Sequence, residues 1–485
     1  MQKILELKNE DWSKGISAQG NIPIGGLFQR LDGVDPFYNQ GMAVPSLTPD
    51  EITTSVSPKF FTSYNSGGVD YVYWAGGRTT KQILKDSPYT QVDRSSEIVT
   101  IYSDFCGAIV WRGKYIYSTP GNGAHSNSIP LANANDTILI NSWQYAIDCT
   151  PMTIGADGNL YCGDGDRVHQ LTNESGTSGN SNYLQIDTGF TVRDMINNGR
   201  YLVVLADNNV RLTADRRVGN YRCRVYFWDM IKTTSDIIYD LDDSYLSAGE
   251  QLDGNIYFFG YNGLYVCNEA TSPKMVRPFV SYNGLSRAKP LTPYQLVKSK
   301  GSIYWIDGSN NTLYNGYVYA YGNPTNGLTK IFYKPHINSN GGQTNAEYVL
   351  QVIGDQFWVG TAQPRIWVQN IGSTRGVATV TSLDKIFPQP YRYELTKVVL
   401  SQPLSSGQSV TCEVTGAGGS KTISAQETKS YSASNPRQVL IFKTSPTSLT
   451  ENRFEDMRVT ITSTGATIQR VTVYGTPLDD ISEII

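Results

Sequence analysis

Short, strand-like phrases rich in aromatic residues recur between residues 70 and 359 of the chain. Each phrase follows a turn residue, usually glycine, and continues as a run of apolar positions. The phrases are DYVYWA at 70–75, GKYIYS at 113–118, GNLYCG at 158–163, GRYLVV at 199–204, GNIYFF at 254–259, GSIYWI at 301–306 and GDQFWV at 354–359. Their spacing averages about 47 residues, which is the length of one four-stranded propeller blade.

Each phrase reads as the start of a hairpin. Glycine tolerates the positive φ of a tight turn, and the Tyr, Phe and Trp residues that follow suit a pleated, half-buried surface. A second turn and strand often come next, as where Tyr261-Asn262-Gly263 leads into Leu264. The repeats therefore predict a β-propeller of about seven blades. Six or eight blades, or a large β-sandwich with similar hairpins, are the alternatives.

From Tyr391 the pattern changes to clean alternation of apolar and polar residues. Met457, Val459 and Ile461 alternate with polar positions, and a second such run follows a short turn at 463–465. This alternation indicates a β-sandwich of about 95 residues. The expected strands are 393–400, 408–415, 420–425, 437–443, 455–462 and 467–474.

The chain thus divides into four expected parts. Residues 1–60 form an extended N-terminal arm, 61–370 the propeller, 371–390 a linker and 391–485 the sandwich. The arm is irregular but carries spaced residues of the kind that proteins bury. We expect it to cross its own propeller as a strap or to reach a neighbouring subunit. The residues expected at such a subunit interface are Trp12, Phe28, Phe37 and Tyr38.

Composition narrows the function classes. Charged residues make up only 17% of the 485 residues, glycine and tyrosine are abundant, and the net charge is −3. These values suit an all-β protein and argue against a strongly basic nucleic-acid binder, although DNA could pass such a surface without adhering. The six cysteines show no C-x-x-C spacing, which suggests buried residues in a reducing compartment. The first residues lack the apolar stretch of a signal peptide, and no apolar run is long enough to span a membrane.

Candidate chemistry is sparse. His125 and His336 lie in expected loops and His169 in an expected strand, and none has a second ligand at a metal-binding spacing. No nucleophile elbow, phosphate-binding loop or dinucleotide fingerprint is present, so we expect no catalytic, cofactor-binding or metal-binding residues. The segment GADGNLY at 155–161 resembles a sialidase Asp box only loosely, because it lacks the Ser and the Trp.

Two further clusters carry a functional and a structural interpretation. The acidic cluster of Asp236, Asp240, Asp242 and Asp243 is either a cation site or a solvated turn, and its spacing does not match a calcium loop. Residues 216–228 interleave basic and aromatic side chains, which is how single-stranded nucleic acid is bound but is also ordinary strand packing. The residues are Arg216, Arg217, Arg222 and Arg224 with Tyr221, Tyr226, Phe227 and Trp228. We favour the structural interpretation of both.

An N-terminal arm, a propeller of about seven blades and a terminal sandwich together resemble the tail hub or nozzle proteins of short-tailed bacteriophages. The glycine–aromatic hairpins carry the resemblance, together with GISAQGNIPIGGLFQRLDGVDPF at 15–37 and the closing strands RFEDMRVTITSTGATIQRVTVYG at 453–475. In that family, copies form a ring, typically a hexamer, that gates the packaged genome and contacts other tail proteins. The family supplies no catalytic residues.

The resemblance implies a structural virion protein, assembled in the host cytoplasm into the phage tail. Its partners would be further copies of itself and other tail proteins, with double-stranded DNA passing through without sequence readout. A receptor- or glycan-binding tail module using exposed Tyr and Trp is the first alternative. A propeller polysaccharide hydrolase, which needs two convergent carboxylates, is the second.

Overall fold

The structure is a computed structural model with an all-β fold. It describes residues 1–8, 11–12, 28–34, 42–45, 47–58, 60–66, 68–76, 79–85, 89–93, 107–119, 123–128, 137–138, 151–173, 179–208, 222–278, 296–299, 301–306, 318–322, 331–333, 349–354, 356–360, 364–369, 375–416, 421–443 and 453–478.

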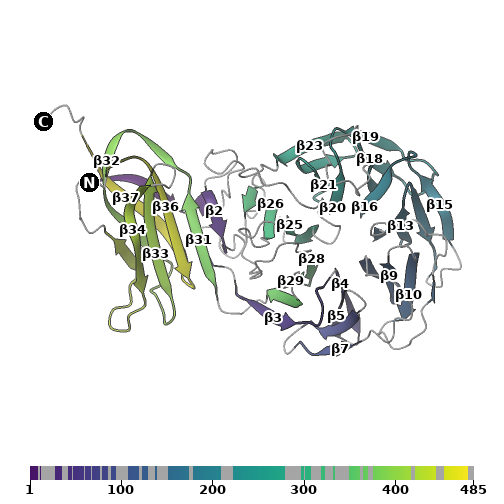
Figure 1. The fold of residues 1–485 in the computed structure, drawn as a ribbon, viewed down its shortest axis with the longest axis horizontal. Coiled ribbons are helices and arrows are strands. Elements are labelled where there is room, and N and C mark those ends of the chain that lie inside the picture. The colour runs from purple at the N-terminus through teal and green to yellow at the C-terminus, as the bar shows by residue number, and fades with distance from the viewer. Residues whose placement is uncertain are drawn as a thin grey trace.

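Seven four-stranded antiparallel sheets form a ring of propeller blades (Figure 1). In chain order, blade 1 contains β4 (Phe60–Ser66), β5 (Val69–Gly76), β6 (Thr79–Leu84) and β7 (Gln91–Asp93); blade 2 contains β8 (Gly107–Trp111), β9 (Lys114–Thr119), β10 (Gly123–Ser128) and β11 (Thr137–Ile138). Blade 3 contains β12 (Met152–Ile154), β13 (Leu160–Asp164), β14 (Arg167–Leu171) and β15 (Gly179–Gln185); blade 4 contains β16 (Thr191–Asn197), β17 (Leu202–Asp207), β18 (Cys223–Trp228) and β19 (Ile237–Leu241). Blade 5 contains β20 (Leu246–Leu252), β21 (Asn255–Gly260), β22 (Gly263–Asn268) and β23 (Thr271–Pro278); blade 6 contains β24 (Leu296–Ser299), β25 (Ser302–Ile306), β26 (Val318–Gly322) and β27 (Ile331–Tyr333). Blade 7 contains β28 (Val349–Ile353), β29 (Gln356–Gly360), β30 (Arg365–Gln369) and, from the N-terminal segment, β3 (Pro49–Thr53).

The seven aromatic phrases are the second strands of the seven blades, so the predicted propeller is confirmed. The turn before each second strand contains a glycine with φ between +64° and +92°, which side-chain-bearing residues rarely adopt. These glycines are Gly68, Gly113, Gly158, Gly199, Gly254, Gly301 and Gly354.

The second strands of blades 3 to 7 each contain at least four consecutive buried residues, rather than the half-buried pattern that their composition suggests. Residues 202–206 of β17 are all fully buried. Successive side chains of a strand point to opposite faces. Accordingly, Leu202 and Val204 join a cluster with Tyr161 of blade 3, while Val203 and Leu205 join one that includes blade 5. Each blade therefore needs a neighbour on both sides.

The N-terminal segment closes the ring. Strand β3 pairs with β30 to complete blade 7, and Ile52 lies opposite Ile366. The Tyr89 hydroxyl, beside blade 1, donates a hydrogen bond of 2.8 Å to Asp50 of β3, and its ring packs edge-on against Trp358 of blade 7. The outermost strand of blade 7 is thus supplied by a segment that precedes blade 1 in the sequence.

The remaining strands form the predicted sandwich of two sheets. One contains β1 (Gln2–Lys8), β37 (Ile468–Pro477), β32 (Lys385–Leu400) and β35 (Val439–Phe442) in this order. The other contains β2 (Phe28–Asp32), β31 (Val377–Ser382), β36 (Arg453–Thr464), β33 (Ser409–Gly416) and β34 (Lys421–Ser430). Met457, Val459 and Ile461 face the core, as their alternation predicts. The first part of β32 pairs with β36 and its later part with β37, which joins the two sheets.

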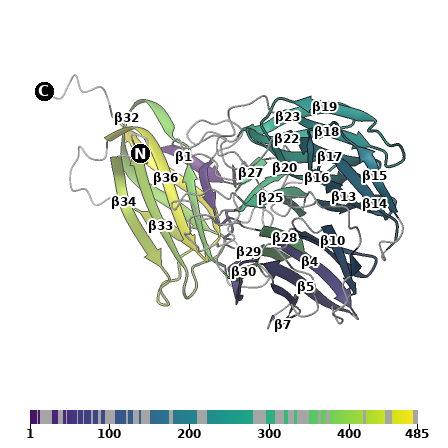
Figure 2. The same ribbon diagram turned by 45° about the vertical axis from the view of Figure 1, so that its right-hand side comes forward.

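The domain boundaries differ from the expected ones. The described residues before Phe60 contain three strands, of which β1 and β2 belong to the sandwich and β3 to the propeller. The expected linker at 371–390 contains β31 and the start of β32. A continuous cluster of buried hydrophobic residues includes Phe28 of the sandwich and Trp305 of blade 6, so the two parts share a core. Figures 1 and 2 show the sandwich beside the propeller ring.

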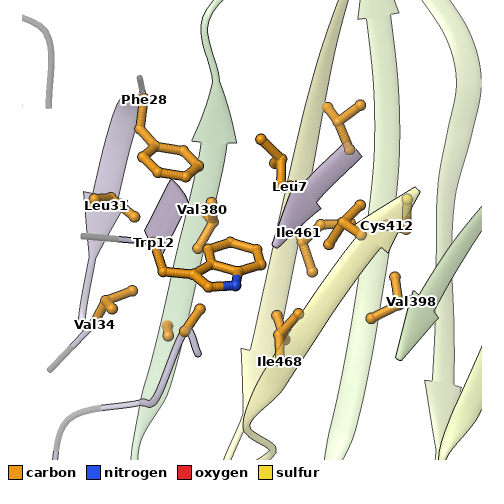
Figure 3. Close-up of a cluster of buried hydrophobic side chains, with 14 of the residues drawn as sticks. Leu7, Trp12, Phe28, Leu31, Val34, Val380, Val398, Cys412, Ile461 and Ile468 are labelled. Carbon is orange, nitrogen blue, oxygen red and sulfur yellow. The ribbon is translucent and has the colours of Figure 1, made fainter. Parts of the chain in front are cut away.

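Trp12 and Phe28 lie in the core of their own chain, not at a surface that a neighbouring subunit could contact. Both side chains are buried, and their rings stack with centroids 5.8 Å apart (Figure 3). The Trp12 indole also donates a hydrogen bond of 3.0 Å to the carbonyl of Gln469. The sequence could not distinguish the two roles, because a buried anchor and an interface anchor have the same composition. Phe37 and Tyr38 lie outside the described residues.

Trp12→Ala should reduce the free energy of unfolding by about 3–5 kcal/mol, because it removes a large buried side chain and leaves a cavity. Urea denaturation measures this change. A variant that unfolds like the wild type but assembles differently would show instead that Trp12 contacts a neighbouring subunit.

Candidate functional site

Buried and partly buried charged residues, together with one exposed lysine, gather where the first strands of blades 4, 5 and 6 meet. Strands β16, β20 and β24 contact one another in succession around the ring. The residues are Arg193 and Asp194 on β16, Asp207 on β17, Glu250 on β20 and Lys298 on β24. We call them the blade 4–6 charge cluster.

Arg193 and Asp207 form a buried ion pair within blade 4. The Arg193 Nε and Nη2 atoms lie 3.0 and 2.9 Å from Asp207 Oδ1, and both side chains are almost completely inaccessible. The other carboxylate oxygen, Asp207 Oδ2, accepts a hydrogen bond of 2.9 Å from the backbone amide of Leu246 in blade 5. A register shift between Val192 and Asp194 lies at this point of β16, as is common where a β-bulge redirects a side chain. The pair therefore connects blade 4 with blade 5.

Asp194 makes a second connection between the same blades. Its Oδ1 atom accepts a hydrogen bond of 2.8 Å from the amide of Met195, and Oδ2 accepts one of 2.7 Å from the amide of Gly249 in blade 5. Burial raises the pKa of Asp194 to about 7, against the opposing effect of these two amides. Glu250, the residue after Gly249, adds a smaller repulsion that also raises this pKa.

Glu250 and Lys298 extend the cluster to blade 6. The Lys298 ammonium lies 3.5 Å from Glu250 Oε1 and donates a hydrogen bond of 3.3 Å to the Gln251 carbonyl. Burial raises the pKa of Glu250, and the attraction of Lys298 opposes that rise. Both side chains keep part of their surface accessible, unlike Asp194.

A carboxyl group with a raised pKa is a candidate general acid or base, and the cluster contains two, Asp194 and Glu250. However, both oxygens of Asp194 are occupied by backbone amides, and its side chain is buried. A substrate would have to displace these amides to reach the carboxyl group. The arrangement therefore favours a structural role, in which buried carboxylates hold neighbouring blades together.

Asp207→Ala should lower the free energy of unfolding by about 3–5 kcal/mol, because it leaves the buried Arg193 guanidinium without its partner. Urea denaturation followed by tryptophan fluorescence measures the change. Asp240→Ala is the matched control: it removes an exposed partner of Arg224 and should cost about 0–1 kcal/mol. Equal effects of the two substitutions would contradict the buried connection.

Asp194 should make stability depend on pH near neutrality. Because its folded-state pKa of about 7 is above its ordinary value of 3.8, its contribution is fully present below the ordinary value and is lost as pH rises through the folded value. The unfolding free energy of the wild type minus that of Asp194→Asn should therefore decrease as the pH rises from about 5 to about 8.

Asp229→Asn is the control for that pH series. Although burial acts in the opposite direction, the amides of Ile231 and Lys232 hold the pKa of Asp229 below its ordinary value. The difference in unfolding free energy between the wild type and Asp229→Asn should thus stay constant over the same pH range. A constant difference for Asp194→Asn as well would refute the raised pKa.

The structure separates the three histidines. His169 lies in β14, as expected, and is buried, with its Nε2 atom 3.7 Å from Asp164 Oδ2. His125 lies in β10 and not in the expected loop. His336 is outside the described residues. Among the residues that the structure describes, no group of His, Cys, Asp or Glu has a geometry suited to a metal ion.

The acidic cluster at 236–243 does not converge on one point. Asp236 pairs with Lys232, and Asp240 pairs with Arg224 at 2.7 Å. Asp243 is buried and accepts hydrogen bonds from the Tyr265 hydroxyl and from the amides of residues 244, 261 and 262. Neither interpretation from the sequence is right for Asp243, since it is neither solvated nor part of a cation site but caps the turns of blade 5.

The described part of the basic and aromatic segment is packed within blade 4. Tyr226, Phe227 and Trp228 of β18 are buried. Arg224 lies over the Phe190 ring and pairs with Asp187 at 2.6 Å, in addition to Asp240. These contacts support the structural interpretation. Arg216, Arg217 and Tyr221 lie outside the described residues, and Arg222 is exposed.

A set of exposed hydrophobic side chains, which the sequence did not predict, lies on the sandwich. Ile386, at the start of β32, is 81% exposed, and Val439 and Ile441 on β35 are 41% and 46% exposed. The sandwich contributes five of the large exposed hydrophobic residues of the described chain: Val377, Ile386, Tyr431, Val439 and Ile441. The segment at 437–443 was expected to be a strand, but its place at the edge of a sheet is a property of the tertiary structure.

No helix of a length and hydrophobicity suited to crossing a membrane occurs in the described segments. No family model and no curated protein matches the chain. Solved structures resemble it in fold at low identity, and none of these likenesses is close enough to support a functional argument.

Two propeller domains and the protein BamB are among these structures. The Dos1 propeller matches with a TM-score of 0.45 and 8% identity, covering 69% of this chain and 90% of that one. The Pan2 WD40 domain of Neurospora crassa matches with a TM-score of 0.41 and 9% identity, covering 65% and 89%. BamB from Moraxella catarrhalis matches with a TM-score of 0.39 and 13% identity, covering 67% and 97%.

Proposed function

We propose that this protein is a structural component that acts through protein–protein contacts, as a subunit of a ring in a phage tail. Its partners in this proposal are further copies of the chain and other tail proteins, and it catalyses no reaction. One observation carries the proposal. The propeller is a closed ring, whereas the sandwich exposes the hydrophobic side chains of Val439 and Ile441 at the edge of a sheet, where another protein can contact them.

Two structural features support a role as a rigid structural component. The propeller closes through β3 and β30, so opening it requires breaking a hydrogen-bonded sheet. The chain also passes from the sandwich strands β1 and β2 into the propeller strand β3, and then returns to the sandwich after β30. Both connections tie the sandwich to the ring, which suits a rigid subunit whose exposed loops and edges contact neighbours.

The charge distribution is compatible with this role. The most perturbed carboxyl group, Asp194, is occupied in joining blades, and Glu250 is paired with Lys298. Neither observation favours a hydrolase. The specific support for a tail protein is the resemblance of residues 15–37 and 453–475 to tail hub and nozzle proteins.

Native mass spectrometry and analytical ultracentrifugation of the purified chain test the proposal. A ring of several copies, six by the resemblance, is the expected result, and low-resolution images should show a central opening. A strict monomer at high concentration would contradict the ring. Glycan-array binding that disappears when exposed aromatics are replaced would favour a receptor-binding module, and depolymerisation of a host polysaccharide would favour a hydrolase.

A further inference from the structure

The outer face of the sandwich sheet formed by β1, β37, β32 and β35 combines apolar and basic side chains. Residues directly opposite each other on paired strands place their side chains on the same face of the sheet. One row across the four strands contains Lys8, Arg470, Val399 and Val439. The next row, two residues along, contains Glu6, Thr472, Lys397 and Ile441. Val439 and Ile441 are 41% and 46% exposed, so this face is open to solvent.

This face has an excess of positive charge. Its cations are Lys3, Lys8, Lys397, Arg437, Lys443 and Arg470, and all of them except Lys397 are exposed. Glu6 lies among them, 3.1 Å from both Lys3 and Lys8. The whole chain has a net charge of −3, so the sign of the charge is reversed here. We call the six cations, together with Val439 and Ile441, the basic face.

The carboxylates at the rim of the basic face have other partners. Glu394 lies 3.0 Å from Arg392, and Glu427 forms an ion pair with Lys429. Asp11 accepts a hydrogen bond of 3.0 Å from the Lys8 amide. Even with Asp11 counted beside Glu6, six cations face two carboxylates. The basic face therefore suits a partner surface that combines carboxylates with apolar side chains.

A surface of that kind lies on blade 4. Three residues of β19 pack toward blade 5, namely Ile237, Tyr239 and Leu241. Because side chains alternate along a strand, the residues between and beside them point the other way. These are Asp236, Ile238, Asp240 and Asp242, which are all exposed, Ile238 by 48%. Ile231, in the loop before β19, is 75% exposed, and its carbonyl accepts a hydrogen bond from Tyr183 of blade 3. We call these five residues the acidic surface.

The cations near the acidic surface do not balance its charge. Arg224 is shared by Asp187 and Asp240, and Lys232 is shared by Asp229 and Asp236. Arg222, at the start of β18, is a third cation. Three cations therefore face five carboxylates, namely Asp187, Asp229, Asp236, Asp240 and Asp242. The loop that carries Ile231 is already ordered, since Asp229 accepts hydrogen bonds from the amides of residues 231 and 232.

The two surfaces match in charge, hydrophobicity and spacing. On each, exposed aliphatic side chains alternate with charged ones along a strand, at a repeat of roughly 7 Å. The sandwich lies at one end of the molecule and β19 on the far side of the ring, so the two surfaces of one copy do not meet (Figure 1). Two basic faces would repel each other, which disfavours a symmetric contact through this face. The occupant that fits the basic face is the acidic surface of a second copy.

We propose that the basic face of one copy binds the acidic surface of blade 4 on the next copy. This contact rests on the ring assembly proposed above and would form one of its subunit interfaces. Because two different surfaces meet, the contact is head-to-tail, which closes into a ring where the rotation between copies permits it. Burial of the aliphatic side chains supplies affinity, and the charges select the partner and its orientation.

Charge exchange tests the pairing. Asp240→Lys combined with Asp242→Lys should dissociate the assembly, as should Lys397→Glu combined with Arg470→Glu. A chain that carries all four replacements should assemble again, because the complementary charges are restored in the opposite sense. Circular dichroism verifies that each variant is folded. Failure of the folded fourfold variant to assemble would overturn the proposal.

Ile441→Glu tests the apolar part of the contact, and Val69→Glu is its matched control. Val69 lies on β5 of blade 1, outside both surfaces, and its exposure of 42% is close to the 46% of Ile441. The Ile441 variant should raise the concentration at which the assembly half-dissociates by about tenfold or more, and the Val69 variant should leave it unchanged. Equal behaviour of the two variants would contradict the contact.

Neutral variants separate this contact from the ring. Asp240→Asn with Asp242→Asn weakens the acidic surface of one chain, and Lys397→Gln with Arg470→Gln weakens the basic face of another. A mixture of the two chains retains one intact pair of surfaces, so native mass spectrometry should find a 1:1 complex that neither chain forms alone. A wild type that forms open head-to-tail chains would support the contact and contradict the ring. A wild-type ring, with no 1:1 complex in the mixture, would overturn the contact and leave the ring standing.

Nucleic acid is the other occupant that a basic face could bind. Raising the salt concentration from about 0.1 M to about 1 M shortens the Debye length from about 10 Å to about 3 Å, and should weaken the assembly about tenfold or more. A short DNA duplex provides the comparison. Binding of the duplex that is lost in the Lys397→Glu, Arg470→Glu variant, while that variant still assembles like the wild type, would overturn the proposal.

Discussion

The fold depends on the burial of both faces of the blades, which the described side chains of blades 3 to 7 show. The second strands carry consecutive apolar side chains, and these point alternately toward the preceding and the following blade, as Leu202 and Val203 do. A blade at an open end would leave one of its faces in water, at a cost of about 25 cal/mol for each Å² of apolar surface. A closed ring removes both open ends. The pairing of β3 with β30 is therefore the contact on which the other blades depend.

The N-terminal segment that closes the propeller also contributes strands to the sandwich. The chain supplies β1 and β2 to the sandwich before it supplies β3 to blade 7. Trp12, which follows β1, and Phe28, the first residue of β2, are buried in the sandwich core. The sandwich thus contains strands from both ends of the sequence, and the propeller lies between them along the chain. Loosening either part would disturb the other, because β3 follows the sandwich strand β2 along the chain and pairs with β30 of blade 7.

Buried charges reinforce the ring at blades 4 and 5. Asp194 and Asp207 each accept a backbone amide from blade 5, and Arg193 balances the charge of Asp207. Such groups are costly to bury, so they specify the alignment of two blades more than they add to stability. The raised pKa of Asp194 is the electrostatic result of the same burial. Asp194 therefore owes its raised pKa to its place between two blades, where both of its oxygens already accept hydrogen bonds from backbone amides.

Local patterns in the sequence were enough to predict the type of repeating unit and an approximate number of blades. The aromatic phrases, the turns before them and the alternation after Tyr391 predict about seven blades and a sandwich, with six or eight blades left open, because hairpins and strand alternation are local properties of the chain. The place of the N-terminal residues follows from the tertiary structure. Trp12 and Phe28 have the composition of any buried anchor, and their partners lie more than 300 residues away in β31 and β37. The tertiary structure likewise decided that β35 is an edge and that Asp194 joins two blades, since neither the neighbours of a strand nor the burial of a carboxylate can be derived from local sequence.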